Sequence, residues 1–294
     1  MKILIAAFLL FIGYGSSAQE FRQHILLLAS DAMQGRPPAT VYEQMAAEYI
    51  HQELQAANCT NVVFQEFPFE NKSAVNVVGI MDFGQDSTVV IAAHYDHLGT
   101  GFNKSLEIVH RHGFHPGADD NASGVAMLVE LAKAIGKVKT WTYNFAFIAY
   151  SAHEAGLFGS TFFSGSDMCK GLNVRAVINM DMVGRMDTAN PVVRVSGAKT
   201  DVLFDNFFKT SENMPFRIRH DDSNITGSDL APFYKMGIPV LNYTTGIHKD
   251  YHKKTDTEDK INYQGMGMIY QLILSSFDLF KFENDCHYMN RDQR

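Results

Sequence analysis

Hydrophobic residues recur along this chain at two alternating spacings. Helical spacing marks residues 20–30, about 40–57, 121–135, 201–213, 228–236 and about 262–282, and a turn at 151–160 leads into a further helix. Short apolar or alternating runs predict strands at 62–69, 75–81, 88–93, 141–150, 174–182, 192–196 and 239–243. The two kinds of segment alternate without an internal repeat. The pattern therefore predicts one α/β domain with a mostly parallel central sheet and helices on both faces.

The first 18 residues depart from this pattern. Lys2 gives a short basic start, residues 3–12 form an apolar run, and Ser16, Ser17 and Ala18 precede Gln19. This order is typical of a cleaved signal peptide, and an apolar run of this length is too short to span a bilayer. We therefore predict a signal peptide at 1–18, one domain at 19–294, no stable membrane span, and export to the periplasm or the extracellular space.

Composition narrows the classes of partner. The chain is 46% hydrophobic and 19% charged, as in ordinary globular proteins, and its formal net charge is −7. An acidic chain without a basic run is not expected to bind nucleic acid. The three cysteines, Cys59, Cys169 and Cys286, are too widely spaced for a disulfide scaffold.

The strongest chemical signal lies in residues 91–124. An apolar strand ends at His94, and Asp96 and His97 follow at once. A polar loop then leads to Asp119 and Asp120 at the start of a predicted helix. Imidazole and carboxylate groups at a strand end and a helix start are typical of a site for zinc or a similar metal ion.

Later strand ends and loops supply further groups of the same kind. In a largely parallel sheet the carboxyl ends of the strands meet at one edge, where binding sites form. Two histidines and three carboxylates are too many for one tetrahedral zinc, but suit two ions that share a bridging carboxylate. Asp96 lies two residues from His94, on the same face, and is expected to accept its free ring N–H. The predicted metal ligands are His94, Asp120, Glu154, Asp181 and His252.

The loop from Leu98 to Pro116 is long for a compact domain. It contains His110, His112 and His115. Long loops are often functional or mobile, and we expect these three histidines to be solvated rather than to bind metal.

These residues carry a family resemblance. The chain resembles the zinc-dependent aminopeptidases of the bacterial leucyl aminopeptidase and aminopeptidase Y type, which share a zinc-exopeptidase fold with glutaminyl cyclases. The resemblance implies that Asp120 bridges two zinc ions, that His94 and Asp181 complete one site, and that Glu154 and His252 complete the other. It also implies a cis peptide between Asp119 and Asp120, and an oxyanion contact from Tyr251. The matching blocks are residues 94–96, 117–124, 154–160, 179–182 and 251–257.

One position departs from the family pattern. Where the family has two adjacent glutamates, a general base and then a metal ligand, this chain has His153 and Glu154. His153 could itself be the base, since a neutral imidazole accepts a proton. Alternatively, the ions alone could activate water and give slow hydrolysis, or the protein could bind zinc and peptide ends with little turnover.

The sequence thus predicts an exported di-zinc aminopeptidase that removes N-terminal residues from peptides with a free N-terminus. His153 and Tyr251 are the expected catalytic residues. The alternatives are a glutaminyl-cyclase-like acyltransferase, which needs one zinc, and a catalytically weak, zinc-dependent peptide-binding protein.

Overall fold

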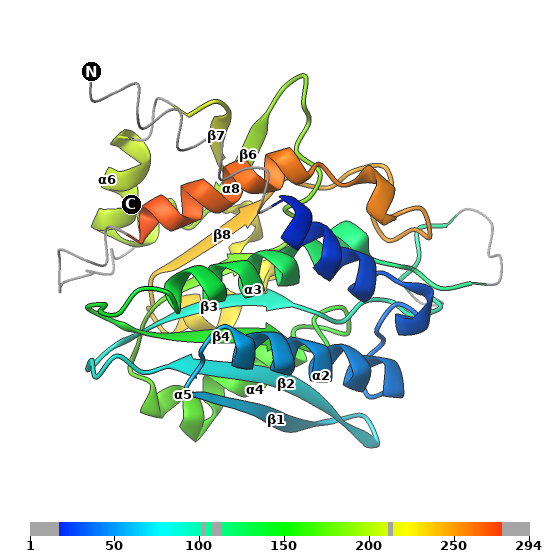
Figure 1. Ribbon diagram of the computed structural model, residues 1–294, viewed down its shortest axis with the longest axis horizontal. Helices are drawn as coiled ribbons and strands as arrows, with labels where there is room; N and C mark the ends of the chain where they lie inside the picture. Colours follow the sequence, from blue (N-terminus) through cyan, green and yellow to red (C-terminus); the bar gives the residue numbers. More distant parts are fainter. Residues whose placement is uncertain (1–17, 102–103, 108–112, 211–213, 278–294) are drawn as a thin grey trace.

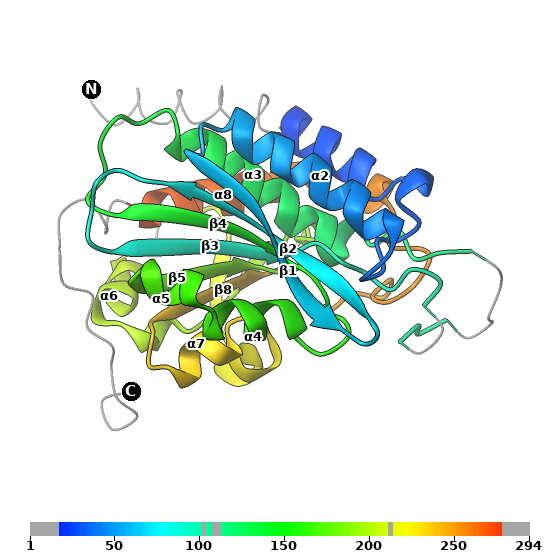
Figure 2. The ribbon, with the colours of Figure 1, turned by 90° about the horizontal axis from the view of Figure 1, so that it is seen from below.

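A computed structural model describes residues 18–101, 104–107, 113–210 and 214–277. These residues form a mixed eight-stranded sheet with helices packed on its two faces (Figures 1 and 2). The predicted single α/β domain is confirmed. The strands are β1 (Asn61–Phe69), β2 (Lys72–Met81), β3 (Thr88–His94), β4 (Asn144–Tyr150), β5 (Val174–Met180), β6 (Val192–Ser196), β7 (Arg217–His220) and β8 (Val240–Thr244).

The order across the sheet is β1-β2-β4-β3-β5-β8-β6-β7. The four central strands β4, β3, β5 and β8 are parallel to one another, and β1, β2 and β6 pair antiparallel to their inner neighbours. The parallel centre brings the carboxyl ends of β3, β4, β5 and β8 to one edge. That edge carries the predicted metal ligands.

The central strands are buried on both faces, which explains why they read as continuous apolar runs. On β3, Val89, Ile91 and Ala93 face one hydrophobic core, while Val90 and Ala92 face the other. Successive side chains of a strand point to opposite faces, so a single strand contributes to both cores. This double burial holds the strand ends, and the polar groups on them, in fixed positions.

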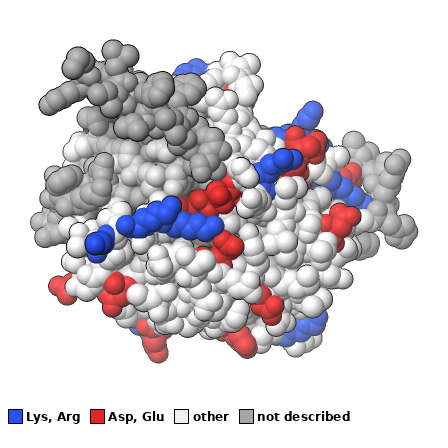
Figure 3. All heavy atoms as spheres, viewed as in Figure 1, with Lys and Arg blue, Asp and Glu red and all other residues white. Residues whose placement is uncertain are grey.

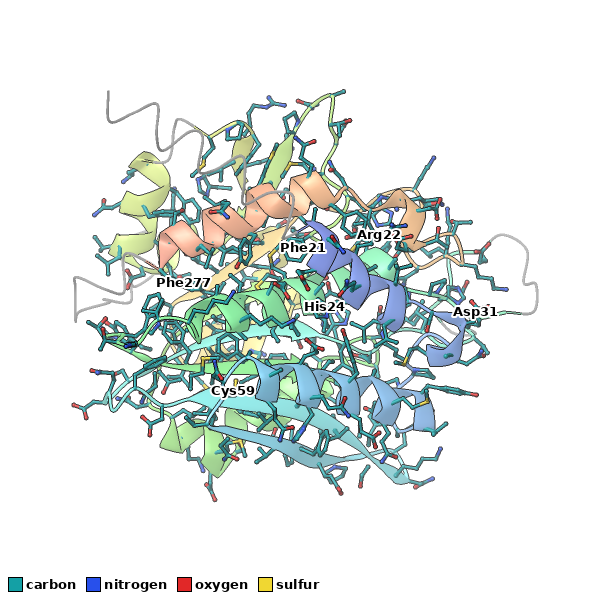
Figure 4. All side chains as sticks on the ribbon, viewed as in Figure 1. Phe21, Arg22, His24, Asp31, Cys59 and Phe277 are labelled. Carbon is teal, nitrogen blue, oxygen red and sulfur yellow. The ribbon has the colours of Figure 1, made fainter. Side chains whose placement is uncertain are left out.

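Helices α2 (Val41–Ala56), α3 (Gly124–Ile135) and α8 (Tyr263–Ser276) cover one face of the sheet (Figure 2). A first helix at residues 18–28 lies over them. Figure 4 labels three of its residues. Phe21 packs edge-on against Tyr270 of α8, and His24 bonds to Glu130 of α3.

Helices α4 (Phe158–Gly165), α5 (Asp167–Gly171) and α7 (Ala231–Lys235) cover the opposite face (Figure 2). Phe163 of α4 and Phe233 of α7 pack together in the core on this side. The remaining helix, α6 (Val202–Thr210), contributes Phe204 and Phe208 to the larger core under α3 and α8.

The sequence did not predict strand β7 or helix α5. Strand β7 has four residues, three of which are exposed, so it shows no apolar run. Helix α5 is a single turn capped by Ser166. Such short, polar elements form because tertiary neighbours hold them, not because of their own pattern.

Several predictions fall outside the described residues. These are the signal peptide (1–17), His110 and His112, the end of the helix predicted at 201–213, the chain beyond 277, and Cys286. Cys59 and Cys169 are free thiols. Among the described residues, no helix combines the length and the apolar character that crossing a bilayer requires.

Candidate metal centre

The ends of β3 and β5 bring two predicted ligands side by side. His94 is the last residue of β3, and Asp181 directly follows β5. The Asn121 side chain amide joins the two strand ends by donating to the carbonyls of His94 (3.3 Å) and Met180 (3.0 Å). His94 Nε2 consequently lies 3.6 Å from Asp181 Oδ1.

Asp120 is held between these strands by the loop before α3. Gly117 has a left-handed φ of 59°, and a Cβ there would lie 2.2 Å from the Asp120 carbonyl oxygen, so only glycine fits. The Asp256 carboxylate accepts the backbone N–H groups of Asp119 and Asp120, each at 3.0 Å. The cis peptide expected between Asp119 and Asp120 is one bond further on, between Asp120 and Asn121.

The turn after β4 places His153 and Glu154. Ala152 adopts a left-handed φ of 54°, which turns the chain at the strand end. The Asp96 carboxylate accepts the backbone N–H groups of His153 (3.0 Å) and Glu154 (3.2 Å). Asp96 was expected to accept the His94 ring N–H through its carboxylate. That separation is 3.7 Å, and the Asp96 backbone carbonyl accepts the N–H instead, at 3.2 Å.

His252 comes from the polar loop before α8. Its Nδ1–H donates to the Lys104 carbonyl at 3.0 Å, just as that of His94 donates to a carbonyl. A carbonyl oxygen only accepts, so in both residues the proton sits on Nδ1 and the lone pair on Nε2 is free. Both Nε2 atoms are buried and lack a hydrogen-bond partner among the described residues.

The spacing of these groups fits a metal site better than hydrogen bonding. His94 Nε2 lies 3.4 Å from Asp120 Oδ1, and His252 Nε2 lies 3.3 Å from Asp120 Oδ2 and 3.2 Å from Glu154 Oε1. Two ligands bound tetrahedrally at about 2.0–2.1 Å stand about 3.3 Å apart. Asp120 Oδ2 is also buried without a partner. The donors present therefore fit zinc.

Asp120 divides these contacts between its two oxygens. Oδ1 faces His94, which neighbours Asp181, and Oδ2 faces His252, which neighbours Glu154. Each oxygen of Asp120 thus faces a separate group of candidate ligands. All five predicted ligands are thus brought together: three come from strand ends or the turn after a strand, and Asp120 and His252 come from loops.

The electrostatics keep the carboxylates ionised. Burial and the Asp120 charge act to raise the pKa of Glu154, but the neighbouring His252 and His97 outweigh them and lower it to about 2. Burial likewise opposes ionisation of Asp120, yet the neighbouring histidines hold its pKa well below the usual range. Ionised carboxylates are the form that binds a cation.

His97 belongs to the site, although sequence reasoning gave it no role. Its Nδ1 lies 3.0 Å from Glu154 Oε1, where its N–H orients that carboxylate. The only available signal was its place three residues after His94. His115, expected in solvent, is instead fully buried, with Nε2 2.8 Å from Ser105 Oγ and its ring 6.4 Å from that of His97.

His153 stands beside the ligands with a partner of its own. Its ring stacks on that of His94, with centroids 3.8 Å apart and planes at 9°. An imidazole nitrogen binds metal in the plane of its ring, so two parallel rings cannot hold the same ion in this geometry. Its Nδ1 pairs with the buried Asp229 carboxylate at 2.8 Å, which leaves Nε2 free.

The Asp229 carboxylate also sets the basicity of His153. Burial and the neighbouring His94 act to lower the pKa of His153, but Asp229 outweighs them and raises it to about 9. The raised value belongs to a site without cations, whose charge would lower it. Sequence reasoning missed Asp229 because it lies 76 residues from His153.

Tyr251 lines the cleft with Asp120, His153, Glu154 and Asp181. Its ring stacks on that of His252, with centroids 3.9 Å apart. Burial and the carboxylate charges raise the pKa of its phenol well above the usual value, so it stays protonated and can donate a hydrogen bond.

Comparison with known proteins agrees with this geometry. Residues 76–277 match the peptidase family M28, which is more than half of the chain. The chain belongs to peptidase family M28. The predicted family resemblance is therefore confirmed.

Individual members of the M28 family and solved structures show the range of this similarity. Leucine aminopeptidase 2 of Arthroderma otae is 28% identical over 236 residues, which cover 69% of this chain but only 43% of that protein. The LapA aminopeptidase of Legionella pneumophila superposes with a TM-score of 0.76 at 20% identity, covering 94% of this chain and 75% of LapA. A glutaminyl cyclase of Bacteroides thetaiotaomicron superposes with a TM-score of 0.75 at 18% identity, covering 91% of this chain and 98% of the cyclase chain. At such identities the structural likeness shows the fold.

A buried arginine ties the M28 site to the rest of the fold. Arg36 is fully buried, and its guanidinium donates to four carbonyl oxygens at 2.5 to 3.0 Å. Burial lowers its pKa to about 10 against the pull of nearby carboxylates, so it keeps its charge at neutral pH. It links the end of the first helix to the segments that carry His94 and Asp120. The carbonyls belong to Leu28, Tyr95, Pro116 and Gly117.

We expect Arg36→Ala to lower the free energy of unfolding by about 3–5 kcal/mol, because it removes a buried charge and leaves four carbonyls without donors. Denaturant titration in the presence of a chelator measures this without a contribution from metal. Arg22→Ala is the control, because Arg22, labelled in Figure 4, is 58% exposed and pairs with Glu258. A loss equal to that of the control would contradict a central role for Arg36.

Proposed function

We propose that this M28 chain is a zinc-dependent aminopeptidase that holds two zinc ions and hydrolyses the first peptide bond of substrates with a free N-terminus. One zinc would be held by His94 and Asp181, the other by Glu154 and His252, with Asp120 shared. The observation that supports this most directly is the division of Asp120 contacts, with Oδ1 3.4 Å from His94 and Oδ2 3.3 Å from His252.

The cleft beside these residues suits the end of a peptide. It has a volume of about 500 Å³, within the range of sites that hold small ligands. Zinc, when bound, would polarise the substrate carbonyl and lower the pKa of a water molecule. The carboxylates and histidines of the chain would hold the ions beside the substrate amine and carbonyl.

The chain's own groups would move the proton. His153 donates Nδ1–H to Asp229, which leaves Nε2 as the acceptor for a proton from the attacking water. The resulting imidazolium, stabilised by the Asp229 carboxylate, can return that proton to the leaving nitrogen. The protonated phenol of Tyr251 is placed in the same cleft to donate to the oxygen that gains negative charge.

The proposal is tested by metal analysis together with a panel of aminoacyl p-nitroanilides and dipeptides. We expect two zinc ions per chain and release of N-terminal residues, lost after chelation and regained with zinc. An N-acetylated copy of each peptide is the control, since blocking the amine should prevent cleavage. Full zinc occupancy without any turnover would contradict the peptidase proposal.

The same measurements separate the two alternatives. A glutaminyl-cyclase-like acyltransferase would bind one zinc and cyclise N-terminal glutamine with release of ammonia. A peptide-binding protein would bind peptides in calorimetry without converting them. The presence of both His94 and Asp181 as paired donors favours two ions.

We also propose that the chain is exported, on the strength of the signal-peptide pattern at residues 1–18. Expressed with that segment in a bacterial host, the protein should be recovered from the periplasm or medium with Gln19 as its first residue. N-terminal sequencing would show retention of Met1 if the proposal were wrong.

A further inference from the structure

A row of paired residues runs from the metal centre to the edge of the sheet. Met180 of β5 pairs with Tyr243 of β8, so Asp181 lies level with Thr244. Thr244 pairs with Arg194 of β6, and Arg194 pairs with Arg219 of β7. Neighbouring strands are about 4.8 Å apart, which puts the Arg194 Cα about 10 Å from that of Asp181.

The arginines of this row face away from the core. Val193 and Val195 of β6 are buried in the core, as alternation requires, so Arg194 points to the opposite face. On β7, Ile218 packs toward the same core, and Arg217 and Arg219 take the other face. Arg194 lines the catalytic cleft and also an adjoining hollow lined by Arg217 and Arg219.

The positive charges of this hollow are incompletely paired. Like charges directly opposite each other on neighbouring strands destabilise a sheet, and Arg194 and Arg219 are such a pair. Asp221 lies 3.7 Å from Arg194, and its pKa is lowered by hydrogen bonds from Ser223 and then by the charges of Arg219 and Arg194. Among the described residues, no ion pair within 4.0 Å joins Arg219 or Arg217 to a carboxylate.

The other charged groups of the hollow do not alter this picture. Arg185 is already paired with Asp250 at 2.8 Å and lies 3.6 Å from Asp256. The Asp187 carboxylate accepts the backbone N–H of Ala189. On the face drawn in Figure 3, by contrast, acidic and basic side chains lie beside one another. Two arginines that are paired on adjacent strands and line the same hollow are a fitting site for a carboxylate.

We propose that Arg194 and Arg219 form a carboxylate subsite of the peptide cleft, selective for substrates with a carboxylate within about one residue of the scissile bond. The proposal rests on the aminopeptidase function proposed above. The carboxylate can belong to an acidic side chain or to the C-terminus of a dipeptide, and the substrates below distinguish these sources.

Three matched substrate pairs test the subsite. The comparison of Ala-Asp amide with Ala-Asn amide tests a carboxylate on the second side chain. The comparison of Asp-Ala amide with Asn-Ala amide tests one on the first side chain. The comparison of Ala-Ala with Ala-Ala amide tests the C-terminal carboxylate. In at least one pair, we expect kcat/KM to be about 10- to 100-fold higher for the substrate that carries the carboxylate. A ratio of this size corresponds to one hydrogen bond to a charged group. Ratios near one in all three pairs would overturn the proposal while leaving the peptidase function intact.

Variants assign the preference to the arginines. Arg194→Gln should bring the ratio close to one, mainly through KM, and Arg219→Gln should lower it. Arg194→Glu should reverse it in favour of a lysine at the same substrate position. The matched control is Arg175→Gln, because Arg175 is at the start of β5, at the end remote from Asp181, and it should keep the wild-type ratio. An unchanged ratio in Arg194→Gln would overturn the assignment.

A binding measurement keeps the subsite testable without turnover. Calorimetry with analogues of the same peptides, in which the scissile bond is reduced to an amine, should show the same preference for the carboxylate. If the wild type cleaves nothing but binds these analogues with that preference, the aminopeptidase proposal fails and the subsite stands. Equal affinity for acid and amide analogues would overturn the subsite.

Discussion

Asp120→Asn is expected to lower kcat/KM for peptide hydrolysis by at least about 10³-fold and to reduce bound zinc from two ions per chain to less than one. Each tenfold loss corresponds to about 1.36 kcal/mol of barrier, and Lewis-acid stabilisation is worth several kcal/mol. Both oxygens of Asp120 face histidine donors, and an amide offers only one oxygen and no charge. One substitution therefore weakens both half-sites at once.

Metal analysis after gel filtration, alongside a peptide assay, measures both effects. Asp31→Asn is the matched control, because Asp31 is an exposed carboxylate outside the predicted ligand set, and the variant should keep full zinc and activity. Circular dichroism checks that the variant is folded. If Asp120→Asn still held two ions, Asp120 would not be the shared ligand.

The second large effect is expected at His153. His153→Ala should lower kcat by about 10²–10⁴-fold, the usual contribution of a general base, while two zinc ions stay bound. The parallel stacking on His94 supports this separation, because it excludes His153 as a ligand of the same ion. Steady-state kinetics with metal analysis on the same sample distinguishes loss of a base from loss of metal.

His153→Glu compares the histidine with the carboxylate that the family resemblance implies at this position. A loss of activity would mark His153 as a base tuned to its surroundings. A large gain would show that the wild-type chain is a weakened hydrolase and would contradict an efficient role for His153. Zinc loss in His153→Ala would instead indicate that the ring binds metal.

The pH dependence of kcat/KM tests whether His153 is the general base. A base acts in its neutral form, so activity rises as pH passes through its pKa. Asp229 is the group that raises the pKa of His153, against burial and His94. Asp229→Asn should therefore move the rising limb of kcat/KM to lower pH. Bound cations lower this pKa in both proteins, so the direction of the difference is kept.

The candidate metal ligands and the residues that orient them differ in how well the sequence predicted them. Residue type and position, at strand ends, a helix start and a polar loop, were enough to select the candidate ligands His94, Asp120, Glu154, Asp181 and His252. The groups that orient them were not predictable in the same way. Asp256 and Arg36 act through backbone groups, and nothing in their local sequence marks such contacts. His97 lies in the predicted metal-binding stretch, but its contact with Glu154 depends on the fold.

The pattern of apolar and polar residues by itself determined the alternation of strands and helices and the parallel centre of the sheet, because burial on both faces requires continuous apolar strands. It also placed three candidate metal ligands, His94, Glu154 and Asp181, at or just after the ends of predicted strands. Only the tertiary structure decided which groups meet. The pairing of His153 with Asp229, the division of Asp120 between two histidines, and the alignment of Arg194 with Arg219 join residues far apart in the chain. Such contacts depend on how the whole sheet and its loops pack, and no local spacing encodes them.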